Sequence, residues 1–249
     1  MITLNNISKT FNQGKPTQVD AVKPLTLAIQ SGEFVVIVGS NGSGKTTLLN
    51  LISGSIAPTS GNMSIHNSDV TKLADHERSK WIARVFQNPL SGTASELSIL
   101  DNFRLAALRT QLKGLTIGIS SAFKTTVKEK VASLGMGLEN KIDQPMGTLS
   151  GGQRQALTLL MSVMDECKVL LLDEPTAALD PRSAEVVMKT ADQLSRDFNL
   201  TTVLVTHNLK DAFTYGNRII QMAEGNILKD YSGQSKSELT QNNLFDWFS

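Results

Sequence analysis

The chain has 249 residues, of which 40% are hydrophobic, 5% aromatic and 19% charged, the composition of a globular protein with a sizeable buried core. Its 24 lysine and arginine residues nearly balance 23 aspartate and glutamate residues, and the net charge is +1. This balance argues against non-specific electrostatic binding of nucleic acid, so we expect no nucleic-acid partner.

The cysteine content and the hydropathy suggest a protein of a reducing compartment. The single cysteine, Cys167, has no partner for an internal disulfide and is expected to be a buried, inert thiol. Residues 1–11 lack the basic and apolar regions of a secretory signal. No apolar run approaches the ~20 residues that span a bilayer, so a membrane role would need another chain.

The chain is predicted to begin with antiparallel strands and to continue into a parallel core. Residues 2–7 and 25–29 alternate apolar and polar side chains, as half-buried antiparallel strands do. Residues 34–38 are all apolar, which favours a central parallel strand, and a helical pattern follows over 45–52.

Strands and helices continue to alternate along the rest of the chain. A second strand pair is predicted at 61–65 and 82–86, with a short helix between its strands. From about Glu96 to Leu138 the pattern is mostly helical, interrupted at 114–118. The elements expected after it are a strand at 169–172, a helix beginning after Pro181, and strands at 202–205, 218–222 and 227–228.

The segment between strand 34–38 and helix 45–52 is the most specific motif. It matches G-x-x-x-x-G-K-[ST], in which glycines let backbone N–H groups face phosphates at a helix N-terminus. Lys45 is predicted to contact the β- and γ-phosphates, Thr46 to ligate Mg²⁺, and Thr47 to bond an α- or β-phosphate oxygen. The predicted phosphate-binding residues are Gly39, Ser40, Asn41, Gly42, Ser43, Gly44, Lys45, Thr46 and Thr47.

Two carboxylates, Asp173 and Glu174, follow the apolar run 169–172. They are expected at the carboxyl end of a buried strand, where α/β sheets bind their ligands. Asp173 is expected to orient the Mg²⁺ shell, and Glu174 to polarise the attacking water as a general base. Two acids after a strand more often form a surface turn, but the phosphate-binding loop favours the catalytic interpretation.

A second anion-binding turn, Leu149-Ser150-Gly151-Gly152-Gln153, opens another helix. A chain that binds one nucleotide hardly needs a second phosphate-binding turn beside the first. With all these motifs in the family's order along essentially its whole length, the chain resembles the ABC-family ATPases. The resemblance implies that four residues cap the γ-phosphate held by the opposite subunit: Ser150, Gly151, Gly152 and Gln153.

The same resemblance assigns four further positions. Gln87 matches the glutamine that touches Mg²⁺ and the attacking water while sensing the membrane partner, and is grouped with Glu174 and His207 as catalytic. Asp180 matches the loop that crosses the dimer interface, and His207 the switch histidine that reaches the γ-phosphate. Phe11 takes the place of the aromatic that stacks on adenine, which is usually tyrosine in the family.

Two other regions carry no predicted chemistry. His66 and His76 lie in polar surroundings without metal-ligand spacing and are interpreted as solvated surface. The segment Leu244–Phe248 is expected to pack back on its own domain rather than on lipid or a partner.

Residues 87–94 and 157–164 depart from the common importer pattern. Both stretches resemble a bacterial subgroup of importer cassettes that accompany binding proteins for aromatic amino acids such as tryptophan and tyrosine. The resemblance therefore implies an importer of amino acids or similar small solutes. Nothing in an ATPase domain contacts the cargo, so the solute itself, the direction of transport and the permease stay open.

The implied fold is an α/β P-loop NTPase core with a mixed sheet, an N-terminal antiparallel β-subdomain and a helical signature subdomain at about 88–160, all within one ATPase domain over 1–249. The implied cofactors are ATP and Mg²⁺. The implied partners are a second cassette (a homodimer is expected, a heterodimer stays open), a membrane permease and a substrate-binding protein. The chain would then lie in the cytoplasm, on the inner face of the membrane.

Three other classes of ATP-binding protein compete with a transporter subunit. A soluble assembly ATPase of the iron–sulfur type shares every motif and stays an alternative. A DNA-repair or chromosome ATPase needs a long coiled coil between the two phosphate cradles, and residues 45–149 contain no sustained heptads. A small-molecule kinase has no use for residues 149–153.

Overall fold

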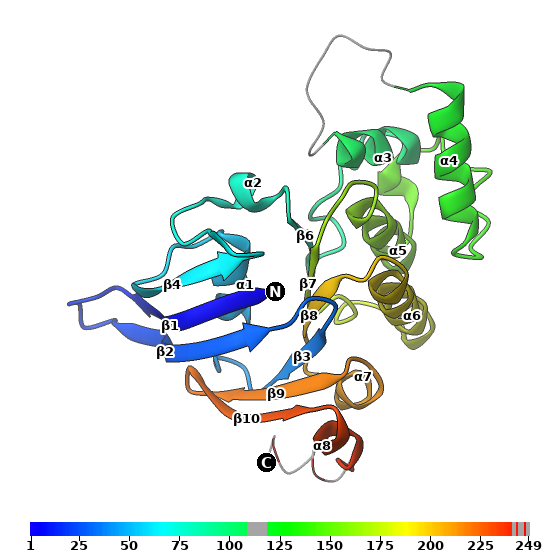
Figure 1. Ribbon diagram of the computed structural model, residues 1–249. Helices are drawn as coiled ribbons and strands as arrows, with labels where there is room; N and C mark the ends of the chain where they lie inside the picture. The colour runs from blue at the N-terminus through cyan, green and yellow to red at the C-terminus, as the bar shows by residue number, and fades with distance from the viewer. Residues whose placement is uncertain (109–118, 241–242, 244–246, 248–249) are drawn as a thin grey trace.

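Two β-sheets and the helices around them make up the computed structural model, which describes residues 1–108, 119–240, 243 and 247 (Figure 1). In this described part the N-terminal sheet is antiparallel, with the strand order β2-β1-β4-β5. Its strands are β1 (Ile2–Phe11), β2 (Val19–Ile29), β4 (Ser60–Ile65) and β5 (Ser68–Asp69).

The central sheet has the order β10-β9-β3-β8-β7-β6, parallel except for its edge strand β10, which runs antiparallel to β9. β3, β7 and β8 are buried along their whole length, which explains the apolar runs 34–38, 169–172 and 203–205. Its strands are β3 (Phe34–Val38), β6 (Ile82–Val85), β7 (Val169–Asp173), β8 (Thr201–Val205), β9 (Arg218–Ala223) and β10 (Asn226–Ser232).

Helix α1 (Lys45–Ser53) contributes Leu48, Leu49, Leu51 and Ile52 to a core that includes residues of both sheets. Buried Arg78 secures the end of this helix, because its guanidinium donates to the Leu51 and Ile52 carbonyl oxygens at 2.7 and 2.9 Å. Burial lowers the Arg78 pKa to about 10. This arginine donates to backbone carbonyls in the last turn of α1, where the Leu51 carbonyl oxygen also accepts from the Gly54 N–H at 3.3 Å.

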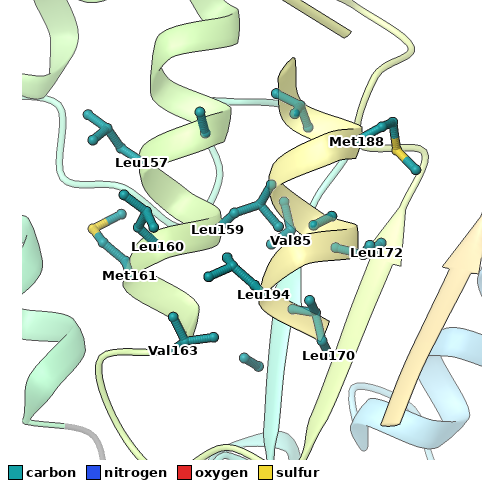
Figure 2. Packing of buried hydrophobic residues seen from close by; sticks show 14 of the residues in the cluster. Val85, Leu157, Leu159, Leu160, Met161, Val163, Leu170, Leu172, Met188 and Leu194 are labelled. Carbon is teal, nitrogen blue, oxygen red and sulfur yellow. The ribbon is translucent and has the colours of Figure 1, made fainter. Parts of the chain in front are cut away.

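A second core lies where α5 (Gly151–Ser162) and α6 (Pro181–Asp197) pack on the central sheet. Figure 2 shows Leu159 of α5 and Leu194 of α6 beside Val85, Leu170 and Leu172 of β6 and β7. The two helices approach closely where α5 begins: a Cβ atom on Gly152 would lie 2.4 Å from the Ser183 Cβ atom. This packing places the beginning of α5 beside the beginning of α6.

Helices α3 (Ile99–Ala107) and α4 (Ser121–Ala132) stand beside α5, away from the antiparallel sheet (Figure 1). Serine hydroxyls cap both: Ser98 accepts from the Asp101 N–H at 3.0 Å and Ser120 from the Phe123 N–H at 3.2 Å. The predicted interruption at 114–118 lies outside the described residues. The short helices are α2 (Asp75–Arg78), η1 (Met146–Thr148), α7 (Leu209–Thr214) and α8 (Gln234–Ser237).

The predicted mixed sheet, antiparallel N-terminal sheet and helices are confirmed, but the predicted pairing of strands 61–65 and 82–86 is wrong. β4 pairs with β1 in the antiparallel sheet, whereas β6 pairs with β7 in the central sheet. The residues of β6 are mostly buried and suit the parallel core, while β4 starts exposed. Apolar patterning predicts a strand but not its partner.

The structure also bears on several smaller predictions. Cys167 is buried, as expected. Of the C-terminal segment only Trp247 is described, and it packs on its own domain: its ring stacks on Tyr231 with centroids 5.7 Å apart. His66 and His76 are exposed, and the described residues contain no cluster of three or more histidine, cysteine or acidic side chains that would hold a metal. Across the described chain, no helix combines the length and apolar character that crossing a bilayer requires.

Candidate active site

The loop from Gly39 to Gly44 connects β3 to α1 and closes tightly against two neighbouring backbones. Gly39 has φ 152° and Gly44 has φ 100°, conformations that other residues rarely adopt. A Cβ atom on Gly39 would lie 2.1 Å from the Met222 carbonyl oxygen, and one on Gly44 would lie 2.3 Å from that of Ala21. Glycine is therefore required at both positions for the loop to reach this shape.

The Lys45 side chain is buried and folded back onto this loop. Its Nζ atom donates to the carbonyl oxygens of Gly39 and Ser40 at 2.8 and 2.9 Å. Burial lowers the Lys45 pKa, and the nearby Glu174 and Asp173 carboxylates offset only part of this decrease. The ammonium group thus sits at the helix N-terminus with hydrogen-bond partners that an anion can replace.

A cleft of about 570 Å³ opens beside the loop. Phe11 and Val19 of the antiparallel sheet line it together with the glycine loop and Thr47. Phe11 is 38% exposed and borders the cleft, and the Lys9 Nζ atom lies 5.2 Å from the centre of its ring. The antiparallel sheet and the central sheet therefore build this cleft together.

Asp173 ends β7 and faces the start of α1. Its Oδ1 atom accepts from the Thr46 hydroxyl at 3.3 Å. Its Oδ2 atom accepts from the Arg84 guanidinium at 2.7 Å, and both side chains are almost buried. Asp173 thus has a partner on each oxygen, and one of them is a cation from β6.

Glu174 and His207 meet at the next position along the same sheet edge. The Glu174 Oε2 atom lies 3.0 Å from His207 Nδ1. Glu174 has φ 46°, a left-handed conformation that glutamate rarely adopts, and its N–H donates to the Val205 carbonyl oxygen at 2.9 Å. The backbone therefore turns sharply after Asp173 and directs this carboxylate into the cleft, whose lining includes Glu174.

Gln87 is exposed two residues after β6, at the edge of the sheet where β7 delivers Asp173, because β6 and β7 run parallel with Val85 opposite Leu172. The backbone before it is held by Gln155 of α5, whose Nε2 atom donates to the Phe86 carbonyl oxygen at 2.8 Å. α5 is therefore tied directly to the segment that carries Gln87.

The turn Ser150–Gln153 opens α5 with a reciprocal cap. The Ser150 hydroxyl accepts from the Gln153 N–H at 3.3 Å, and the Gln153 side chain accepts from the Ser150 N–H at 3.1 Å. Ser150 and Gly151 are exposed. Among the described residues that line the cleft beside Lys45, none belongs to this turn.

Asp180 is exposed and caps α6. Its Oδ1 atom accepts from the N–H groups of Arg182 and Ser183 at 3.1 and 3.0 Å, and the hydrogen bonds from Ser183 lower its pKa. Asp180 is therefore a negative charge held at a fixed place next to the start of α5.

Comparison with known proteins identifies the family. The model of the ABC transporter family matches residues 22–177. The chain belongs to the ABC transporter family. It is 39% identical to a tyrosine transport ATP-binding protein of Clostridioides difficile (strain R20291), over 100% of this chain and 98% of that relative.

Two further relatives show how widely the cassette is used. The chain is 36% identical to the macrolide export ATP-binding/permease protein MacB of Campylobacter fetus, over 97% of this chain but 36% of that protein. A solved dimeric structure of the cassette MJ0796 in a post-hydrolysis state, bound to ADP and Pi, matches with a TM-score of 0.80 and 29% identity, covering 93% and 98% of the two chains. This protein is thus an ATP-hydrolysing ABC cassette.

The donor groups at the cassette's sheet edge suit Mg²⁺, which prefers oxygen ligands and bridges phosphate oxygens. The Thr46 hydroxyl and the Asp173 carboxylate already face each other, and Gln87 offers an amide oxygen at the same edge. The residues present therefore fit a magnesium ion that arrives with a triphosphate.

The structure brings most of the predicted site residues to one sheet edge and leaves 150–153 and Asp180 outside the cleft. Sequence reasoning missed Arg84 and Gln155, which contact Asp173 and the Phe86 carbonyl oxygen. The signal that Arg84 carried was a charged residue within an otherwise apolar four-residue strand, and it did not indicate the partner. Gln155 carried none, because its contact joins residues 69 positions apart.

Proposed function

We propose that this cassette binds Mg-ATP in the cleft beside Lys45 and hydrolyses it in a dimer whose second copy completes the site. The observation that carries this proposal is the separation of the two phosphate-binding turns. Gly39–Thr46 borders the cleft, whereas the turn Ser150–Gln153, in which Ser150 and Gly151 are exposed, lies outside it. A second copy of the chain brings the missing turn to the open side of the nucleotide.

Each predicted residue has a task within this dimer. Phe11 stacks on adenine, and Gly39–Thr47 holds the phosphates, with Lys45 moving from the loop carbonyls to the β- and γ-phosphates. Thr46, Asp173 and Gln87 hold Mg²⁺, which neutralises phosphate charge. Glu174 accepts the proton of the attacking water, and His207 orients Glu174 and contacts the γ-phosphate.

The residues outside the cleft act across the dimer interface. Ser150, Gly151, Gly152 and Gln153 cap the γ-phosphate of the partner's nucleotide with the N-terminus of α5. Asp180 crosses to the opposite cassette from its fixed position at the start of α6. A homodimer satisfies both requirements, because each copy supplies what the other lacks.

A membrane permease is the proposed target of the energy released. Three exposed leucines, Leu90, Leu97 and Leu105, lie in the segment that joins β6 to the helical region and in α3. ATP-driven closure moves this region only if ATP binds the closed dimer better than the open one. The location that follows is the cytoplasmic face of the membrane. The division into one domain over 1–249, with a helical subdomain at about 88–160, is part of this proposal.

The cargo is proposed to be an aromatic amino acid or a similar small solute, taken up with the help of a substrate-binding protein. The support is the name of the tyrosine transport relative, which matches this chain over nearly its full length. Competition for uptake among tyrosine, tryptophan and leucine in vesicles with the permease tests this assignment. Uptake that ignores the aromatic amino acids would contradict it.

Mixed dimers test the composite site. Ser150→Arg and Lys45→Ala chains, each inactive alone, are combined with wild type as the reference. Because the two substitutions fall in different halves of each site, a mixed dimer keeps one intact site and recovers part of the ATPase rate. Failure of any mixture to recover activity would contradict the composite site, as would a wild-type monomer that hydrolyses ATP at a specific rate independent of protein concentration. Purification without any membrane protein would favour the soluble assembly ATPase instead.

A further inference from the structure

The guanidinium group of Arg84 contacts three residues at the proposed nucleotide site. One nitrogen donates to Asp173 Oδ2 at 2.7 Å, and the other terminal nitrogen donates to Asn50 Oδ1 of α1 at 2.7 Å. The guanidinium carbon also lies 4.8 Å from the centre of the Phe86 ring. The Arg84 and Asp173 side chains are 11% and 10% exposed, so water screens this ion pair only weakly.

The ion pair between Arg84 and Asp173 sets the net charge of the side chains at this edge of the sheet. Asp173 and Glu174 bring two negative charges, and Lys45 lies close enough to interact with both. Arg84 adds a second positive charge. The formal charges of these four side chains therefore sum to zero before a nucleotide binds. Without Arg84 they would sum to −1. A divalent cation is attracted to anionic oxygens, so the neutral set holds it poorly.

We propose that Arg84 neutralises Asp173 and thereby makes magnesium binding depend on the phosphates of ATP. The empty cassette then has little affinity for the metal, and the triphosphate supplies the missing negative charge. Arg84 acts on the metal only through the charge of Asp173. This proposal rests on the Mg-ATP site proposed above.

An orienting role for Arg84 alone predicts the opposite outcome. If Arg84 served only to aim Asp173, its removal would loosen the carboxylate and weaken metal binding. Asp173 is held by other means as well, since it ends the fully buried strand β7 and accepts from Thr46 at 3.3 Å. Removing Arg84 therefore costs little orientation but frees a full negative charge.

The test compares Mn²⁺ binding to the nucleotide-free protein, with free Mn²⁺ measured by electron paramagnetic resonance. Arg84→Met and Arg84→Gln both remove the charge, and Arg84→Lys retains it. Arg218→Met is the matched control, because Arg218 is an arginine of similar exposure whose ion pairs, with Glu33 and Asp230, lie elsewhere in the fold. The neutral variants are expected to bind Mn²⁺ roughly tenfold more tightly than wild type. Arg84→Lys and Arg218→Met are expected to stay close to wild type.

Folded neutral variants that bind Mn²⁺ no more tightly than wild type would overturn the proposal, and weaker binding would assign Arg84 the orienting role alone. Circular dichroism establishes that each variant is folded. Binding of the ATP analogue AMP-PNP by wild type, with and without Mn²⁺, is measured alongside. If wild type binds no Mn²⁺–AMP-PNP complex, the proposed function itself is contradicted. If wild type binds this complex but Arg84→Met binds Mn²⁺ with the wild-type affinity, only the role of Arg84 is contradicted.

Discussion

The Glu174 carboxylate oxygen Oε2 lies 3.0 Å from the Nδ1 atom of His207, although the two residues are 33 positions apart. Strands β7 and β8 bring them together, because they run parallel with Asp173 opposite Val205. The contact places an oriented carboxylate beside the phosphate-binding loop. This geometry suits the proposed roles, in which Glu174 accepts a proton and His207 keeps the Glu174 side chain in one orientation.

Replacing Glu174 with glutamine should separate ATP binding from hydrolysis. The amide keeps the size of the side chain but accepts protons poorly, so hydrolysis should fall roughly 10²–10⁴-fold while ATP still binds. Phosphate release and size-exclusion chromatography with ATP check both expectations, and the variant should accumulate as an ATP-bound dimer. Glu185→Gln, an exposed site on α6, serves as the control. Turnover of Glu174→Gln near the wild-type rate would rule out the role of Glu174.

Lys45→Ala should abolish tight Mg-ATP binding. The ammonium, which now bonds to the Gly39 and Ser40 carbonyl oxygens, is the cation expected to contact the β- and γ-phosphates. Isothermal titration calorimetry measures the loss, and Lys23→Ala, elsewhere in the cleft lining, controls for the removal of a positive charge. Wild-type affinity in Lys45→Ala would show that the loop does not hold the phosphates in this way.

Leu90→Asp should uncouple transport while the isolated chain still binds ATP. Leu90 is 54% exposed and follows the Gln87 segment, so an aspartate costs the isolated cassette little. In an apolar contact with a permease helix the same charge would be buried without a partner. Substrate uptake and ATPase rate in the same reconstituted vesicles measure the coupling.

The matched control for that experiment is Leu228→Asp. Leu228 is 59% exposed on β10, far along the sheet order from β6. Its substitution should leave uptake unchanged. Normal uptake with Leu90→Asp would place the permease contact on another surface.

Arg78→Ala should destabilise the fold without touching the nucleotide cleft. It removes a fully buried side chain and takes one hydrogen-bond donor from each of the Leu51 and Ile52 carbonyl oxygens. The expected loss in free energy of unfolding is about 2–4 kcal/mol. Urea denaturation checks it against Arg182→Ala, an exposed arginine whose loss should change stability by less than about 0.5 kcal/mol. Equal stability of the two variants would contradict the structural role of Arg78.

The local motifs were readable from the sequence because each depends on neighbouring residues. The glycine loop needs positive φ at Gly39 and Gly44, and only glycine meets that requirement without strain. The buried strands β3, β7 and β8 show as apolar runs, and α6 begins at Pro181, directly after its capping residue Asp180. The order of these motifs was sufficient to indicate the family and its fold.

Only the tertiary structure decided which distant residues meet. Apolar alternation specifies the buried face of a strand but not its neighbour, so the pairing of 61–65 with 82–86 was predicted wrongly. The same limit hid the contact between Arg84 and Asp173, which depends on β6 lying next to β7 with matching register. Strand pairing results from the packing of the whole core, and the charge of the proposed metal site follows from that pairing.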